Sequence, residues 1–450
     1  MRTLSGLVLC LLGSTVPVFA DDWPQWRGPK RDGVWRETGI VEKLPGKLPI
    51  RWRREIGGGY AGPAVAGGRV YVTDRQLSSG VRNPDDPFHR EKLKGSERVI
   101  CLDAGTGADV WIHEYPCQYE IQYPAGPRAT PTVDGGKVYS LGAMGHLACL
   151  DAVKGTVLWS KDLLKELKGE INAWGYSSAP LVDGQRLFVV AGGSEGAGLV
   201  ALDKDTGKEI WRAIDVEDFG YAPPVMLDTG SLRQLIYWSP KAVHALEPTT
   251  GKVLWEEPFQ LQSGLSVATP IFDPEKRRLF VTAFYNGPLM LQLSNGEPGA
   301  AVVWRGKSQS ERQTDGLHAI LCTPALKDGH IYGVCSYGQL RCLEAETGKR
   351  VWETREATGD GRWWNAFLIR HEDRFFIANE QGDLIIADLS PHGYKELSRA
   401  KLIDAVQPIQ RRKVVWSHPA FAGRAVFARN DQEILCVDLG RGSKPGYTRP

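Results

Sequence analysis

Eight side chains that could bind a ligand lie shortly before predicted strands, at comparable places along the chain. They are aromatic or polar residues, namely Arg128, Trp174, Tyr176, Tyr221, His318, Trp363, Asn365 and His418. Aromatic faces with a few polar groups suit an aromatic, sugar-like or peptide ligand. The alternative is that these side chains fill the interior and satisfy one another. The sequence predicts no catalytic residue and no metal site.

Two short motifs resemble cofactor or catalytic signatures but lack the surroundings that such sites need. Residues 57–62 fit GxGxxG, yet Pro63 begins a strand where a dinucleotide site requires a helix. Residues 192–196 fit GxSxG, yet they precede LVALD in a hairpin loop rather than forming a strand-to-helix turn. Neither motif predicts catalysis.

The elements that must position the eight side chains form a repeat. The phrase CLDAGTGADVW (101–111) returns with changes at 149–159, 201–211, 245–255 and 342–352. Its tryptophan recurs every 44 to 59 residues from Trp52 to Trp352. A proline-containing segment, an apolar strand and a second apolar strand precede each phrase. Each unit therefore predicts four short antiparallel strands.

The number of units predicts a closed ring. Weaker copies at 366–399 and 418–438 bring the count to eight, and the last copy has only three strands. Residues 49–55 carry Trp52 without preceding strands, so they supply the missing one. We predict an all-β fold, an eight-bladed β-propeller of four-stranded antiparallel blades over 49–440, closed by the N-terminal strand. An open solenoid is the alternative, and the split last unit argues against it.

This arrangement gathers the eight side chains. Loops that enter the first strand of each blade ring one mouth of the central channel, and all eight residues lie in those loops. The long loop 75–97 is expected beside the same mouth, as a lid, a partner surface or a solvated segment.

The cysteines and tryptophans of the repeat are expected to be structural. Cys101, Cys149, Cys342 and Cys436 share one repeat position and predict small core side chains. Cys322 and Cys335 differ, because the hairpin CTPALKDGHIYGVC places them opposite each other. A disulfide between these two is one possibility, and free thiols are the other.

The chain begins with a predicted signal peptide. Arg2 precedes an apolar run from Leu4 to Leu12, and residues 18–20 form a cleavage site before Asp21. Residues 21–48 are then an N-terminal extension, and 441–450 a flexible tail. No later run reaches the length of a membrane span. We expect a periplasmic or secreted protein after cleavage near Ala20. The net charge of +2 and the absence of a basic face argue against nucleic acid.

The repeat resembles the pyrroloquinoline quinone (PQQ) repeat family, whose phrase A-x-D-A-x-T-G-x-x-x-W matches about 50–438. Residues 22–34, DWPQWRGPKRDGV, resemble the start of many secreted propellers of this kind. The family includes quinoprotein alcohol dehydrogenases and the non-enzymatic outer-membrane assembly lipoprotein BamB. The resemblance implies a propeller fold, and the fold alone does not choose between these functions.

Two functions follow from the resemblance. The first is a non-catalytic, BamB-like scaffold or ligand-binding module, monomeric and without cofactor, that holds a protein partner or small ligand at the channel mouth. The alternative is a PQQ-dependent quinoprotein dehydrogenase with calcium. In that case Trp174, Trp363 or Trp364 would stack on the cofactor and Arg128 would pair with a carboxylate. The first is preferred, because the chain lacks the adjacent cysteine pair and the large inserted loops of the dehydrogenases.

Overall fold

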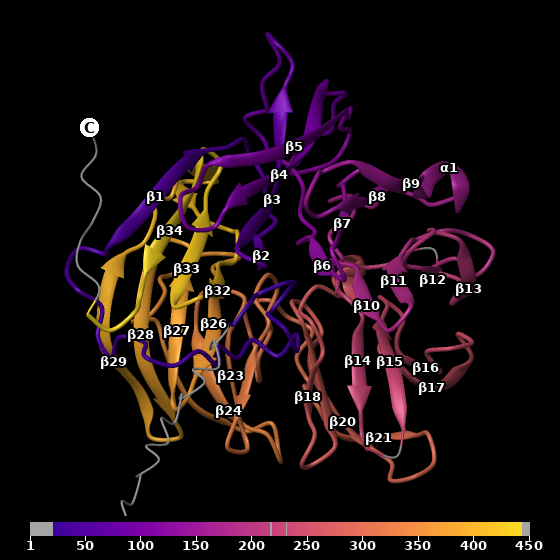
Figure 1. Cartoon of the computed structure of the whole chain (residues 1–450). Helices are drawn as coiled ribbons and strands as arrows, with labels where there is room; N and C mark the ends of the chain where they lie inside the picture. The colour runs from indigo at the N-terminus through magenta and orange to yellow at the C-terminus, as the bar shows by residue number, and fades with distance from the viewer. Residues whose placement is uncertain (1–20, 217, 231, 443–450) are drawn as a thin grey trace, which may run out of the picture.

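The described strands form a ring of eight four-stranded sheets around a central axis (Figure 1). The computed structural model describes residues 21–216, 218–230 and 232–442. The predicted signal peptide (1–20) and nearly all of the predicted tail lie outside these residues. Each sheet has four antiparallel strands, so the eight-bladed propeller is confirmed. No helix among the described residues is long and apolar enough to cross a membrane.

The first four blades follow one another along the chain. Their strands are β2 (Ala64–Ala66), β3 (Arg69–Leu77), β4 (Gly95–Asp103) and β5 (Asp109–Pro116) in blade 1; β6 (Thr132–Asp134), β7 (Lys137–Leu141), β8 (His146–Asp151) and β9 (Val157–Asp162) in blade 2; β10 (Leu181–Asp183), β11 (Arg186–Val190), β12 (Leu199–Asp203) and β13 (Glu209–Ala213) in blade 3; β14 (Val225–Asp228), β15 (Arg233–Trp238), β16 (Ala242–Leu246) and β17 (Val253–Pro258) in blade 4.

The remaining blades continue in the same order, and the last one combines the first strand of the propeller with its last three strands. Their strands are β18 (Ile271–Asp273), β19 (Arg278–Ala283), β20 (Gly287–Leu293) and β21 (Ala300–Arg305) in blade 5; β22 (Ala325–Lys327), β23 (His330–Val334), β24 (Leu340–Glu344) and β25 (Arg350–Thr354) in blade 6; β26 (Ala366–His371), β27 (Arg374–Asn379), β28 (Asp383–Ser390) and β29 (Gly393–Lys401) in blade 7; β32 (Ala420–Ala422), β33 (Ala425–Arg429), β34 (Glu433–Asp438) and β1 (Ile50–Glu55) in blade 8.

Outside the blades, the described part of the chain forms three short elements. They are the helix α1 (Leu163–Glu166), the 3-10 turn η1 (Gln262–Gly264) and the hairpin of β30 (Gln407–Ile409) and β31 (Arg412–Val414). The hairpin connects blades 7 and 8, and Ile409 and Val414 are buried against Tyr123.

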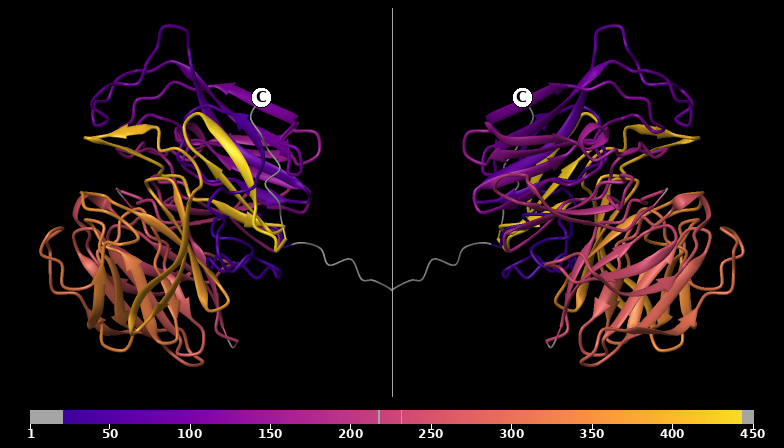
Figure 2. Two further views of the ribbon diagram at one scale, coloured as in Figure 1. Left: turned by 90° about the vertical axis from the view of Figure 1, so that its left-hand side faces the viewer. Right: turned by 90° about the vertical axis from the view of Figure 1, so that its right-hand side faces the viewer.

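The ring closes through the N-terminal strand, as predicted. Strand β1 pairs with β34, and Trp52 lies opposite Cys436. Figures 1 and 2 show the indigo start and the yellow end of the propeller side by side. Pairing removes two exposed sheet edges that would otherwise be free to pair with another chain.

The repeated phrase builds the contact between neighbouring blades. Trp111 of blade 1 donates its indole N–H to the Ala152 carbonyl of blade 2, at 3.1 Å. Its ring covers Gly155 in the turn that follows, where a Cβ atom would come within 2.5 Å of the ring. Trp159 repeats both contacts with Lys204 and Gly207 of blade 3. Each of these two tryptophans therefore needs a glycine in the next blade.

The small residue of the phrase lies opposite the tryptophan. Cys101 pairs with Trp111 across β4 and β5, and Cys149 pairs with Trp159 across β8 and β9. Cys101 and Cys149 are fully buried, as are the equivalent Cys342 and Cys436. The large ring fills the space beside a small side chain, which confirms their predicted core position.

Cys322 and Cys335 are free thiols. The hairpin has the predicted register, with Lys327 opposite His330. Strand pairing stops at Ala325, however, so the ladder does not extend to Cys322. The Cys335 sulfur instead contacts the Arg341 guanidinium at 3.1 Å, and Cys322 lies near the Val334 carbonyl at 3.9 Å. The possible disulfide is absent because the two sulfurs have separate surroundings.

The residues before β1 cover one end of the channel. Trp23 exchanges backbone hydrogen bonds with Val65 of blade 1, and the Trp35 N–H donates to the Arg370 carbonyl of blade 7. Between them, Trp26 donates to Thr269 before blade 5 at 2.8 Å. We call residues 22–35 the floor segment.

Arg31 fastens the floor segment to two further blades. Its guanidinium is buried and donates to the carbonyls of Ala179, Pro180 and Pro224, which precede blades 3 and 4. Burial lowers the pKa of Arg31 to about 9. An arginine without a carboxylate partner inside the protein is costly, so these carbonyls are what make its position stable.

Candidate functional site

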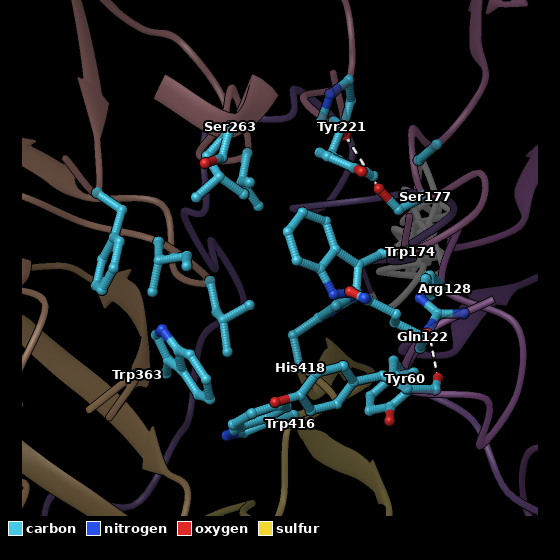
Figure 3. Close-up of a pocket in the computed structure, with 18 of the residues that line it drawn as sticks. Tyr60, Gln122, Arg128, Trp174, Ser177, Tyr221, Ser263, Trp363, Trp416 and His418 are labelled. Carbon is cyan, nitrogen blue, oxygen red and sulfur yellow. Dashed lines mark hydrogen bonds between the residues drawn. The ribbon is translucent and has the colours of Figure 1, made fainter. Parts of the chain in front are cut away.

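An aromatic cavity of about 530 Å³ lies in the channel above the floor segment (Figure 3). Its walls come from loops of most blades, and Trp26 of the floor segment forms part of its base. A volume of this size matches pockets that hold small organic ligands. Figure 3 shows Trp363 and Arg128 on opposite sides, with Trp174 and Trp416 between them.

Five of the eight proposed binding residues line this cavity together. They are Arg128, Trp174, Tyr221, Trp363 and His418. Trp174 and Tyr221 meet edge to face, with ring centres 5.5 Å apart. The structure thus brings these five residues together from blades 2, 3, 4, 7 and 8.

The other three proposed residues lie outside the cavity. Tyr176 is fully buried in blade 3, where its hydroxyl donates to the Ala191 carbonyl at 2.7 Å and its ring stacks on Phe219. His318 is also fully buried, and its Nδ1 donates to the Phe284 carbonyl at 3.1 Å. Burial lowers the pKa of His318 despite the nearby Asp315. Both side chains are therefore engaged inside the blades.

Asn365 is the third residue outside the cavity. It is fully buried, its backbone N–H donates to Glu380, and neither atom of its side-chain amide has a hydrogen-bond partner among the described residues. Phe367, two residues later, lines the cavity in blade 7. Blade 7 lacks the proline that opens most other blades, so sequence alone placed the facing residue two positions too early.

Several cavity residues were missing from the eight. Trp26 comes from the floor segment, Phe88 from the loop between β3 and β4, and Tyr123 from the loop before blade 2. Phe88 reaches across to Trp363, with ring centres 5.7 Å apart, and contacts Tyr123 at 5.1 Å. The unusual length of the β3–β4 loop could have indicated that one of its residues, such as Phe88, reaches the cavity. Trp26 had no comparable signal.

The backbone is strained at three cavity residues. Tyr123, Ser263 and Trp363 have φ values of 53°, 57° and 65°. Residues other than glycine rarely adopt positive φ, and bulky ones least of all. Such strain costs on the order of 1–3 kcal/mol each and clusters at ligand sites. The positive φ at Tyr123 and Trp363 therefore lowers the stability of the fold while placing both rings at the cavity.

His418 is held in one neutral form on the cavity wall. Its Nε2 accepts a hydrogen bond from the Thr130 hydroxyl at 2.7 Å, and its Nδ1 donates to the Pro419 carbonyl at 3.3 Å. The Trp26 ring meets the imidazole edge to face at 4.4 Å. Burial lowers the pKa of His418 to about 4. The imidazole is therefore uncharged at neutral pH.

Two arginines line the cavity, and they differ in their partners. Arg362 pairs with Glu311 at 2.6 Å and lies over the Trp363 ring at 4.6 Å. Arg128 lies over Tyr60 at 4.9 Å and donates only to backbone carbonyls, those of Gln122, Tyr123 and Gly126. Burial lowers the pKa of Arg128. None of the described lining residues is an aspartate or glutamate.

The described residues contain no group of three or more His, Cys, Asp or Glu side chains placed to bind a metal ion. The cavity offers aromatic faces, one neutral imidazole and two guanidinium groups. This chemistry suits binding of a flat, largely apolar molecule.

A family model described as "Outer membrane protein assembly factor BamB" matches residues 95–354 and 298–450. Among curated proteins, BamB of Yersinia pestis is 26% identical over 285 residues, covering 61% of this chain and 66% of that protein. Quinohemoprotein alcohol dehydrogenase ADH-IIG of Pseudomonas putida is 27% identical over 405 residues, covering 82% of this chain and 45% of that protein. The chain thus spans less than two thirds of the length of both relatives.

Solved structures show the same fold. BamB from Moraxella catarrhalis superposes with a TM-score of 0.58 at 15% identity, covering 88% of this chain and 99% of that one. ADHIIG from Pseudomonas putida HK5 gives 0.57 at 13% identity, covering 95% and 82%. Both similarities concern the propeller architecture.

Proposed function

This chain belongs to the PQQ-like repeat propellers that the BamB family model describes, and on that premise we propose that it is a non-catalytic, ligand-binding propeller. The proposal places it outside the cytoplasm, as a monomer, after removal of the predicted signal peptide. Its ligand is a small, largely apolar molecule held in the aromatic cavity. A protein partner at the same mouth is the scaffold variant of this proposal.

The aromatic cavity is the observation that supports this function. Trp174, Tyr221 and Trp363 present ring faces or edges to a space of ligand size, closed below by Trp26. Rings of this kind contribute through buried area and through stacking. Tyr123 and Trp363 also line this space from backbone of positive φ, which bulky residues rarely adopt.

Ligand binding is tested with a neutral aromatic probe. Calorimetric titration of the purified full chain with 3-methylindole should show binding at one site. Trp174→Leu should weaken it about tenfold, because stacking and buried area are lost. Ile210→Ala, on the exposed face of β13, serves as the control and should bind as the unchanged protein does. Absence of binding, or equal affinity in all three proteins, would refute the proposal.

The dehydrogenase is the second candidate, supported by the alignment with ADH-IIG over 82% of this chain. Trp174 and Trp363 could stack on a quinone and Arg128 could pair with a carboxylate. Calcium, however, requires several oxygen ligands, mostly carboxylates and carbonyls. The described lining residues supply no carboxylate, and Trp364 is buried outside the cavity. The donor set does not fit a calcium–quinone centre.

A direct measurement separates the two candidates. The purified chain is mixed with PQQ and calcium, and both cofactor absorbance and dye reduction with an alcohol are recorded. The ligand-binding proposal expects no dye reduction at any ratio of cofactor to protein. Turnover that saturates at one cofactor per chain would establish the dehydrogenase instead.

A further inference from the structure

Two asparagines of this chain stand directly before a glycine, and both lie at turns of blade 5. Asn286 and Gly287 lie where β19 turns into β20, and Asn295 and Gly296 lie between β20 and β21. An Asn-Gly pair can close into a succinimide, because glycine has no side chain to hinder attack of its backbone nitrogen on the asparagine amide. Whether a pair reacts then depends on how firmly the fold holds it.

Asn286 is held through both atoms of its amide. Its Oδ1 accepts a hydrogen bond from the Gln262 N–H at 2.9 Å, and its Nδ2 donates to Gln309 at 2.7 Å. The residue is only 9% exposed. Gly287 packs against the His318 ring, which a Cβ atom would approach within 2.9 Å. Closing a ring here would break both hydrogen bonds, so the fold protects this pair.

Asn295 lacks these restraints. It is exposed, and its side chain makes no hydrogen bond to any of the described residues. Gly296 has a φ of 90°, and no atom of a non-adjacent residue lies within 4 Å of the place where its Cβ would be. A backbone hydrogen bond from Ser294 to Gly299 closes the turn at 2.9 Å without involving the pair. The Asn295 amide is thus free to approach the Gly296 nitrogen.

The equivalent turn of blade 1 is fastened by a carboxylate. Asp103 accepts hydrogen bonds from the Gly105 and Thr106 N–H groups at 3.1 and 2.8 Å. Blades 2, 3 and 4 repeat this clamp with Asp151, Asp203 and Glu247. Gln292 stands at this position in blade 5, but its amide donates instead to carbonyls of the β18–β19 turn. The turn that carries Asn295 therefore lacks the clamp.

The neighbouring blade does not hold this turn either. Trp111 and Trp159 each donate to the turn of the next blade, at 3.1 Å. Trp255 of blade 4 donates instead to Gln234 of its own blade, at 2.6 Å. No glycine of the turn 294–299 meets the Trp255 ring. This turn has neither of the two contacts that the repeated phrase gives blades 2 and 3.

We propose that Asn295 is a site of spontaneous deamidation through a succinimide formed with Gly296. The Gly296 nitrogen loses its proton and attacks the side-chain carbonyl carbon of Asn295. The bond from that carbon to Nδ2 breaks, and ammonia leaves with a proton. Water then opens the ring at either carbonyl and leaves aspartate or isoaspartate. One water is consumed and one ammonia released, and the inference does not depend on the proposed ligand-binding function.

The two asparagines can be compared within one tryptic fragment. Trypsin cuts after Arg278 and Arg305, so residues 279–305 carry both pairs. The purified full chain is kept at about pH 9, where base promotes loss of the amide proton, and the fragment is followed by tandem mass spectrometry. We expect a gain of about one dalton at Asn295, at least about 10-fold faster than at Asn286, because two hydrogen bonds must open there first.

Unfolding supplies the matched control. In concentrated urea the fold holds neither pair, so the two asparagines should react at similar rates. Asn295→Gln should abolish the gain in mass at this position and leave Asn286 unchanged, because the longer glutamine side chain closes the corresponding ring far more slowly. Enzymatic methylation of isoaspartate gives an independent readout, and circular dichroism confirms that the chain in urea-free samples is folded.

The possible outcomes are distinct. An Asn295 that stays intact in the folded chain overturns the inference. Equal rates at Asn295 and Asn286 in the folded chain also overturn it, because the fold would then not select the site. Conversion of Asn295 alone in the folded chain, with similar rates in urea, supports it. Failure of 3-methylindole to bind would refute only the ligand-binding function, since the turn 294–299 supplies none of the described cavity residues.

Discussion

At the scale of single residues, the sequence predicted five of the residues that line the cavity, and whether they bind a ligand stays a prediction. Arg128, Trp174 and Tyr221 line one cavity, in keeping with their predicted place in the loops before the first strands. Tyr176 and His318 lie in the same loops but point into their blades. Which way a loop residue points depends on backbone dihedrals that sequence does not reveal.

His418 makes stability depend on pH. The unfolded imidazole has a pKa near 6.5, whereas burial holds the folded one at about 4. Below pH 6.5 the unfolded chain binds a proton that the folded chain resists, so stability present at neutral pH is lost on acidification towards pH 4. The loss amounts to roughly 3 kcal/mol.

Denaturant unfolding measured from pH 7.5 to pH 4 tests this dependence. His418→Gln should flatten the curve, because glutamine keeps hydrogen-bonding capacity without titrating. His392→Gln, at an exposed position, should leave the curve unchanged. Parallel curves for His418→Gln and the unchanged protein would contradict the prediction.

At the scale of elements, the repeated phrase predicted blades and their number because its residues act locally. Trp111, for example, contacts the next blade through one hydrogen bond to Ala152 and through Gly155, and both residues belong to the next copy of the phrase. The β30–β31 hairpin was not predicted, since 407–414 matches no repeat unit. The closeness of Phe88 to Trp363 was not predicted either, because a long loop has no periodic constraint.

The contact between blades can be tested with two glycines of similar backbone conformation. Gly155 and Gly184 have φ values of 72° and 58°, but only Gly155 lies under a tryptophan ring. Alanine at either position bears the cost of positive φ, about 1–2 kcal/mol. Gly155→Ala must also displace Trp111, which adds about 1–3 kcal/mol. Denaturant unfolding should rank Gly155→Ala below Gly184→Ala, and equal stability of the two would contradict the proposed contact.

The β3–β4 loop should control the release of a ligand. Phe88 contacts Tyr123 and Trp363 above the cavity, and aromatic pairs contribute about 0.5–1.5 kcal/mol. Phe88→Ala should therefore raise the dissociation rate of 3-methylindole about 2- to 10-fold in stopped-flow measurements. Leu77→Ala, exposed at the end of β3, provides the control. An unchanged rate in Phe88→Ala would show that the loop does not cover the ligand.

At the scale of the whole molecule, counting the strands was sufficient to predict closure. The last unit lacked one strand and the first residues supplied one, so the pairing of Trp52 with Cys436 followed from the arithmetic. The floor segment was not predicted. It belongs to no repeat, and its arginines resemble surface residues until the structure shows the carbonyls around them.

The floor segment should stabilise the ring as a unit. Arg31→Met leaves three carbonyls without their donor and should lower the free energy of unfolding by about 2–4 kcal/mol. The adjacent Lys30→Met is the matched control, since Lys30 is exposed. Thermal unfolding followed by circular dichroism measures both. Equal melting temperatures would mean that Arg31 does not join the blades.

Because residues 22–35 lie across one end of the channel, the cavity is reached from the opposite mouth. We therefore expect a small molecule to enter and leave the cavity by the same mouth. Two different ligands would then compete for one binding site, and the second could bind only after the first had dissociated.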